Sequence, residues 1–257
     1  MFARKHHNSN VSEADFCTVK RIAASVLLCV AVTTTSAHLA KQGQQIAAQG
    51  TSQGVAACIS CHGAKGEGMG AFPRLAGTGE AYLLAQLDAF AIGARKNPIM
   101  QPIAQGLQPA ERQAVAMYFS QLQAPLLAVD LKQPLTSDTG AWLATRGRWA
   151  DQVPACTQCH GPGGSGVGAP FPPLAGLPAA YIAEQLQAWK AGNRPPGPLA
   201  LMAGVAKKLS DAEITAVAAY YEKIALPKRT GIPDVPRAAG APGVMNPAAP
   251  TQTKGAP

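Results

Sequence analysis

The chain is poor in the large side chains that usually fill a protein core. Only 5% of its 257 residues are aromatic, although 47% are hydrophobic. The ordinary hydrophobic fraction excludes a disordered chain. No apolar run approaches the ~20 residues that a membrane-spanning helix needs, which excludes a polytopic membrane protein. The shortage of aromatic residues predicts that something other than side chains fills part of the interior.

The first segment has the pattern of an export signal. A basic pair at residues 20–21 precedes an apolar stretch at 22–32, and small residues follow. We interpret residues 1–37 as a cleaved signal peptide, which would take Cys17 and Cys29 with it. An uncleaved anchor is the alternative, although such a short apolar stretch is a poor membrane span.

Outside this segment, cysteine is confined to one kind of motif. The other four cysteines belong to Cys-x-x-Cys-His sequences at residues 58–62 and 156–160, which lie 98 residues apart. A glycine-rich loop and the pattern Phe-Pro-x-Leu-Ala-Gly follow each motif, at residues 72–77 and 171–176. This repetition predicts two tandem copies of one structural unit.

Both copies predict helices and no sheet. In the first copy, Leu83, Leu87 and Phe90 have the i, i+4, i+7 spacing of a helix that stops at Gly93. The second copy repeats the pattern with Ile182, Leu186, Trp189 and Gly192. A second helix closes each copy, after Gln108-Pro109 in the first and after the capping-box residues Ser210 to Glu213 in the second.

The predicted fold is therefore all-α with two tandem domains. We expect a first domain at 38–123, a linker at 124–138, a second domain at 139–226 and a disordered tail at 227–257. The tail holds seven prolines, with four basic residues against one acidic residue. It is either simply solvated or weakly associated with an anionic membrane surface or an acidic partner.

The Cys-x-x-Cys-His sequence is the attachment signature of c-type haem. The thiols of Cys58 and Cys61, and of Cys156 and Cys159, are predicted to bond covalently to the vinyl groups of two haems. The adjacent His62 and His160 are then placed to bind the irons. Haem is large, flat and apolar, so it would supply the missing core. A disulfide in each pair, a thioredoxin-like redox site and a zinc site are the alternatives.

Methionine is the expected ligand on the other side of each iron. His38 is the only other histidine beyond the predicted signal, and no cysteine is spare. Met100 and Met202 each lie eight residues before the start of the closing helix, so we expect both in matching loops as axial ligands. Histidine–methionine ligation raises the reduction potential relative to two histidines. It also leaves no open position on the iron, which favours an electron carrier over an enzyme.

With these motifs, residues 41–226 resemble the dihaem cytochrome c4 family. The resemblance implies two class I cytochrome c domains, each wrapped around one covalent haem, and a periplasmic location. It also implies that the carbonyl groups of Pro73 and Pro172 accept hydrogen bonds from the ligand histidines. Arg95 and Arg194 are either partners of haem propionates or plain surface arginines.

The predicted function is electron transfer from a quinol-oxidising complex or a dehydrogenase to a terminal oxidase or reductase. The formal charge of +8 predicts redox partner proteins with an acidic docking face and rates that fall with salt. No catalytic residue and no nucleic-acid partner are expected. One alternative is a dedicated cytochrome subunit of a periplasmic dehydrogenase. Another is a haem enzyme such as a dihaem peroxidase, which would need an iron open to its substrate.

Overall fold

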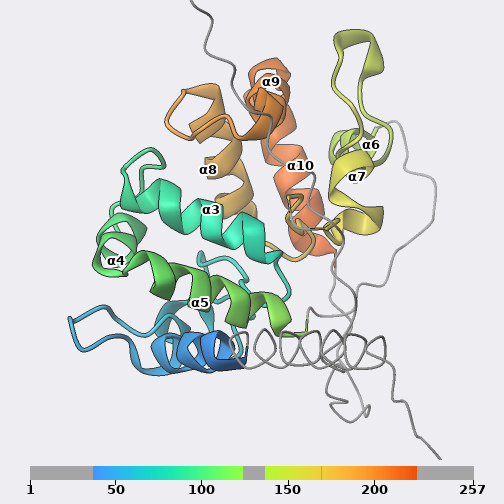
Figure 1. Ribbon diagram of the computed structural model, residues 1–257. Helices are drawn as coiled ribbons and strands as arrows, with labels where there is room; N and C mark the ends of the chain where they lie inside the picture. The colour runs from blue at the N-terminus through green and yellow to red at the C-terminus, as the bar shows by residue number, and fades with distance from the viewer. Residues whose placement is uncertain (1–36, 124–136, 169, 225–257) are drawn as a thin grey trace, which may run out of the picture. The chain divides into compact units, whose positions relative to one another are not determined.

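The computed structural model describes residues 37–123, 137–168 and 170–224 (Figure 1). Nearly all of the predicted signal, most of the predicted linker and the predicted tail lie outside the described residues. Within the described ranges the regular structure is helical, with β-pairing limited to isolated bridges such as Met69 with Phe72. This confirms the prediction of an all-α fold. None of the helices described is long and apolar enough to cross a membrane.

The first copy begins with a helix at residues 37–49. It continues with α2 (Ile59–His62), α3 (Glu80–Ala91), α4 (Met100–Gly106) and α5 (Pro109–Gln121). The second copy contains α6 (Thr139–Thr145), α7 (Cys156–His160), α8 (Ala179–Lys190), α9 (Leu201–Lys208) and α10 (Asp211–Lys223). Short 3-10 turns occur at η1 (Trp149–Asp151), η2 (Pro162–Gly164) and η3 (Pro198–Ala200).

The helix ends follow the signals in the sequence. Gly93 and Gly192, just beyond α3 and α8, adopt φ angles of +72° and +74°, which favour glycine. The Ser210 hydroxyl accepts a hydrogen bond from the Glu213 backbone N–H at 3.2 Å, and the Glu213 carboxylate accepts one from the Ser210 N–H at 2.8 Å. The capping box predicted at the start of α10 is therefore formed.

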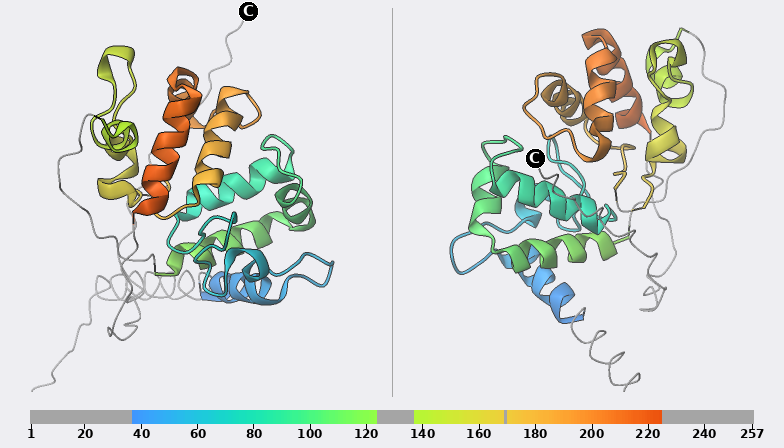
Figure 2. Two further views of the ribbon diagram at one scale, coloured as in Figure 1. Left: turned by 180° about the vertical axis from the view of Figure 1, so that it is seen from behind. Right: turned by 45° about the horizontal axis from the view of Figure 1, so that its top comes forward.

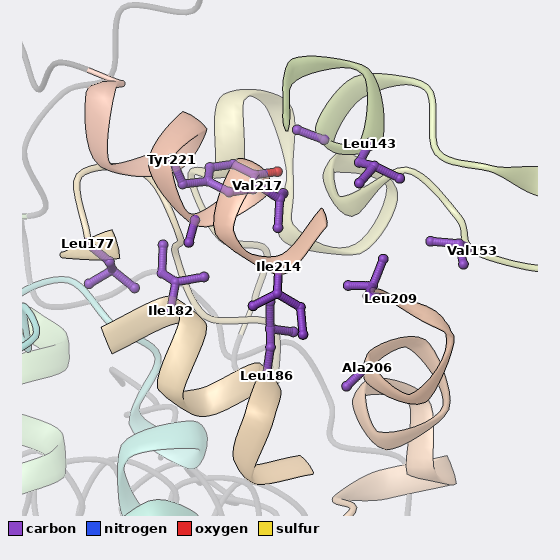
Figure 3. Packing of buried hydrophobic residues seen from close by; sticks show 12 residues of the cluster. Leu143, Val153, Leu177, Ile182, Leu186, Ala206, Leu209, Ile214, Val217 and Tyr221 are labelled. Carbon is purple, nitrogen blue, oxygen red and sulfur yellow. The ribbon is translucent and has the colours of Figure 1, made fainter. Parts of the chain in front are cut away.

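Each copy buries its own hydrophobic cluster. Helix α3 packs against α4 and α5, while α10 packs against α6 and α8 (Figures 1 and 2). Phe119 of α5 and Tyr221 of α10 occupy matching positions and are each only 1% exposed. Figure 3 shows Tyr221 together with Ile182 and Leu186 of α8 in the second cluster. The two copies thus repeat one packing scheme around one large aromatic ring each.

Two glycines allow the first helix of each copy to meet its closing helix at backbone distance. A Cβ atom added at Gly43 would lie 2.0 Å from the carbonyl oxygen of Ala114 in α5. One added at Gly140 of α6 would lie 2.3 Å from the carbonyl oxygen of Ala216 in α10. Both neighbours are backbone atoms, so they cannot rotate away. A side chain at either glycine would push the two helices apart.

Gly43→Ala and Gly140→Ala are therefore each expected to lower the free energy of unfolding by about 1–3 kcal/mol, because overpacked helices must separate. Guanidinium unfolding of the haem-loaded protein measures this loss. Gly204→Ala in α9 is the matched control, since no atom of the described residues lies within 4 Å of a Cβ at that position. There we expect no loss, because alanine favours helix by up to about 1 kcal/mol. Equal stabilities for the three variants would contradict the close crossing.

Candidate functional site

The two Cys-x-x-Cys-His motifs form matching short helices that bury their histidines. His62 ends α2, His160 ends α7, and each is 6% exposed. The Nδ1 atoms of His62 and His160 lie 2.7 Å from the carbonyl oxygens of Pro73 and Pro172, as the resemblance implied. Because a carbonyl oxygen only accepts, Nδ1 carries the proton in each ring. The lone pair of each neutral imidazole therefore resides on Nε2.

The Nε2 atom on the far side of the His62 ring is available to bind a metal. This atom is buried and has no hydrogen-bond partner among the described residues. Burial lowers the pKa of both His62 and His160, against the smaller effect of the proline carbonyl contacts, which raise it. Each ring is thus kept neutral and fixed in orientation, which is the state in which imidazole binds a metal. The site fits an iron ligand.

The four cysteines are partly buried free thiols, so neither disulfide considered from the sequence is formed. Burial raises the pKa of Cys58 and of Cys156 to about 11, which keeps both thiols protonated at neutral pH. Structural zinc requires thiolate or imidazole ligands in a cluster. In the part of the chain that the structure describes, no three His, Cys, Asp or Glu side chains gather closely enough to hold a metal ion. These residues fit covalent haem attachment better than a zinc site.

The two methionines occupy matching places, but not in loops. Met100 is the first residue of α4 and Met202 the second of α9, so the prediction of loop positions is wrong. The Asn97 side-chain oxygen accepts hydrogen bonds from the backbone N–H groups of Ile99 and Met100, at 3.0 and 2.9 Å. These contacts replace missing helical partners and hold Met100 in a first turn. The axial role of both methionines stays a prediction.

Arg95 and Arg194 are buried, each only 6% exposed, so the interpretation as surface arginines is wrong. Each guanidinium also stacks on an aromatic ring of its own copy. The Cζ atom of Arg95 lies 4.4 Å from the centre of the Phe90 ring, and that of Arg194 lies 3.8 Å from the Trp189 ring. Such stacking is favourable for arginine and holds the planar group in place.

The two arginines also make reciprocal hydrogen bonds between the copies. Each donates to a glutamine of its own copy and to a tyrosine and a glutamine of the other. Arg95 donates to Gln86 (3.0 Å), Tyr181 (3.2 Å) and Gln185 (2.6 Å). Arg194 donates to Gln185 (3.0 Å), Tyr82 (2.8 Å) and Gln86 (3.0 Å).

All of these acceptors are neutral, so none of these contacts within residues 37–123, 137–168 and 170–224 supplies a negative charge to the two buried arginines. Burial lowers the pKa of Arg194 because the charged form loses its hydration. Buried charges in proteins are normally paired with an opposite charge. The two buried arginines are therefore suited to bind anionic groups, such as the negatively charged propionates of haem. Sequence reasoning found the two arginines but missed Tyr82, Gln86 and their counterparts.

Comparisons with known proteins agree with this geometry. A family model described as Cytochrome c matches residues 40–123 and 150–225. A thiosulfate dehydrogenase electron acceptor of Stutzerimonas stutzeri (strain A1501) is 47% identical over 195 residues, which are 75% of this chain and 90% of that protein. A cytochrome c4 of Stutzerimonas stutzeri is 36% identical over 216 residues, which are 79% of this chain and 99% of that protein.

The fold is also similar to a longer solved protein. A thiosulfate dehydrogenase from Marichromatium purpuratum matches with a TM-score of 0.65 and 40% identity. The match covers 77% of this chain and 45% of that chain. More than half of that longer protein therefore has no counterpart in the match.

Proposed function

This chain belongs to the cytochrome c family, in its dihaem cytochrome c4 branch, and we propose that it accepts electrons from a periplasmic thiosulfate dehydrogenase. It is an electron carrier with two covalent haem c groups. In the proposed site, Cys58 and Cys61 hold the first haem, and Cys156 and Cys159 hold the second. His62 with Met100, and His160 with Met202, occupy the axial positions.

The proposed iron ligation is supported most directly by the Nε2 atom of His62, which is buried and has no hydrogen-bond partner in the part of the chain that the structure describes. The Pro73 carbonyl fixes the opposite nitrogen as a donor, so Nε2 can only accept a proton or bind a metal. Haem supplies one-electron iron chemistry when bound. A histidine and a methionine that both bound the iron would leave no open position for a substrate. Each site then gains or loses one electron and nothing else.

The surface beside each methionine supports a protein partner. Ile99 and Leu201 directly precede Met100 and Met202, and they are 49% and 47% exposed. Lys96 is exposed near Ile99, and Lys207 and Lys208 are exposed at the end of α9. Exposed apolar residues and exposed lysines in these segments favour a partner whose surface has both apolar and acidic residues. Electrons would then cross close to the haem ligands.

The choice of donor comes from the relatives. One relative is described as the electron acceptor of thiosulfate dehydrogenase, and a longer solved relative is itself called a thiosulfate dehydrogenase. A carrier with two haems can accept two electrons, one at each iron. A dedicated cytochrome subunit of the same dehydrogenase remains the second candidate, because that longer chain includes a part similar to this one.

Thiosulfate dehydrogenase supplied with thiosulfate is expected to reduce both haems of this protein rapidly. The rate should fall about tenfold or more as the salt concentration rises from ~0.1 M to ~1 M, because the Debye length shrinks from ~10 Å to ~3 Å. Stopped-flow absorbance of the ferrous haems measures it. Ile99→Ser with Leu201→Ser should slow the reaction at unchanged reduction potentials. Slow, salt-independent reduction would refute this donor, and stable co-purification with the enzyme would favour the subunit role.

A further inference from the structure

The two copies differ at one buried position next to the histidine contact. The residue after Pro73 is Arg74, whereas the residue after Pro172 is Pro173. Both positions are buried. The first copy therefore has a buried cationic residue next in sequence to the proline whose carbonyl contacts the proposed ligand histidine, and the second copy has an uncharged residue there.

Arg74 has no partner for this charge among the described residues. It is 6% exposed, its Nε atom is buried without a hydrogen-bond partner, and burial alone lowers its pKa. Arg95 and Arg194, in contrast, each donate several hydrogen bonds. Burying a guanidinium without an anion is strongly unfavourable, because the group loses its hydration and no hydrogen bond or opposite charge replaces it. A missing anion is therefore expected beside Arg74.

The described carboxylates of the first copy do not supply this anion. Glu67 accepts from the Lys65 N–H, Asp88 pairs with Arg112, and Glu111 accepts from the Gln108 N–H. Glu80 has its pKa raised by burial, with no cation among the causes. The acidic residues outside the described ranges are Glu13, Asp15, Asp130 and Asp234. Of these, only Asp130 lies between the two copies.

We propose that Arg74 pairs with a propionate of the first haem and thereby raises the reduction potential of that haem alone. This rests on the proposed attachment of that haem at Cys58 and Cys61. Haem binding necessarily brings carboxylates into the first copy, because each haem carries two propionates. Pairing neutralises the negative charge of the propionate, which otherwise favours the ferric iron. Reduction adds one electron to the iron, and no bond to Arg74 forms or breaks.

The pairing gives the two haems unequal reduction potentials, because only the first copy has an arginine at this position. Pro173 has no charge and no backbone N–H, so it cannot replace the guanidinium in the second copy. The effect of Arg74 is therefore confined to one of two otherwise matching sites. A carrier with unequal potentials collects its first electron preferentially at one haem.

The test is a spectroelectrochemical titration of the holoprotein and its variants. Arg74→Gln should lower one of the two midpoint potentials by about 59 mV, a tenfold change in a one-electron equilibrium, and leave the other unchanged. Arg74→Lys should restore most of the loss, because it keeps the charge. Pro173→Arg should raise the other midpoint. Repeating Arg74→Gln in a Met202→His background, where the second haem is shifted far away, identifies the affected haem as the first.

The possible outcomes distinguish failure of the Arg74 pairing from failure of the proposed function. A protein with both haems bound but with no potential changed by Arg74→Gln, or with both shifted equally, overturns the pairing and leaves the carrier function intact. Asp130→Asn is the control for the other anion and should leave both midpoints unchanged. A rise of the first midpoint in Asp130→Asn would show that Asp130, and not a propionate, neutralises Arg74. Absence of haem from the wild-type protein would instead refute the proposed function itself.

Discussion

Replacing Met100 by histidine is expected to lower the reduction potential of the first haem by well over ~59 mV, which is a tenfold change in its one-electron equilibrium. Histidine donates more strongly to ferric iron than the soft methionine sulfur does, so it stabilises the oxidised state. Axial ligands and their surroundings change haem potentials over a range of ~0.8 V. The second haem should keep its potential, because its own ligands are unchanged.

Optical redox titration and the charge-transfer absorption of sulfur-ligated ferric haem together measure this change. Met202→His is the reciprocal variant and should move only the second haem. Met69→His is the matched control, since Met69 is 52% exposed in the loop after α2 and has Val167 at the corresponding place in the second copy. An unchanged titration curve for Met100→His would show that another residue ligates the first iron.

Changing both Cys58 and Cys61 to serine is expected to leave the protein with one covalent haem instead of two. A hydroxyl group does not form the thioether bond, so the first haem is lost when the chain is denatured. Mass spectrometry of the exported chain should show the loss of one haem, and the haem absorbance should fall by half. The first copy should also lose stability, because haem fills part of an interior that has few large side chains.

Cys156→Ser with Cys159→Ser should give the same result for the second copy. Cys29→Ser is the control, because Cys29 lies in the predicted signal and outside any Cys-x-x-Cys-His motif. Two haems retained in the Cys58 and Cys61 double variant would contradict the proposed attachment.

Much of the fold could be predicted because its signals are local. The i, i+4, i+7 spacing of Leu83, Leu87 and Phe90 reappears as α3, and Gly93 follows its end. The Ser210 capping box forms as predicted. Helices depend on contacts between residues three or four apart, so their signature is visible in a short window. The helical positions of Met100 and Met202 were missed because α4 and α9 have only seven and eight residues, too few to show a clear helical period in the sequence.

The close crossings at Gly43 and Gly140 could not be predicted by the same reasoning. A glycine inside a helix is unfavourable on local grounds. Glycine is needed at these positions only because the carbonyl of Ala114 or Ala216, in a helix far along the chain, packs against it and leaves no room for a Cβ atom.

The arginine contacts could have been found from the constant separation of matching residues in the two copies. Tyr82, Gln86 and Arg95 each lie 99 residues before a counterpart.

The sequence by itself determined the kind of chemistry expected of this protein: two haem-attachment motifs, two histidines proposed as iron ligands and a repeated helical pattern. Haem attachment depends on residues within five positions, so spacing alone reveals it. Only the tertiary structure decided that Arg95 and Arg194 exchange hydrogen bonds between the copies. It also decided that Arg74 is buried and that its Nε atom has no hydrogen-bond partner in the described part of the chain. Contacts such as that of Arg194 with Tyr82 join residues 112 positions apart, and the chain must fold before either side chain has a neighbour.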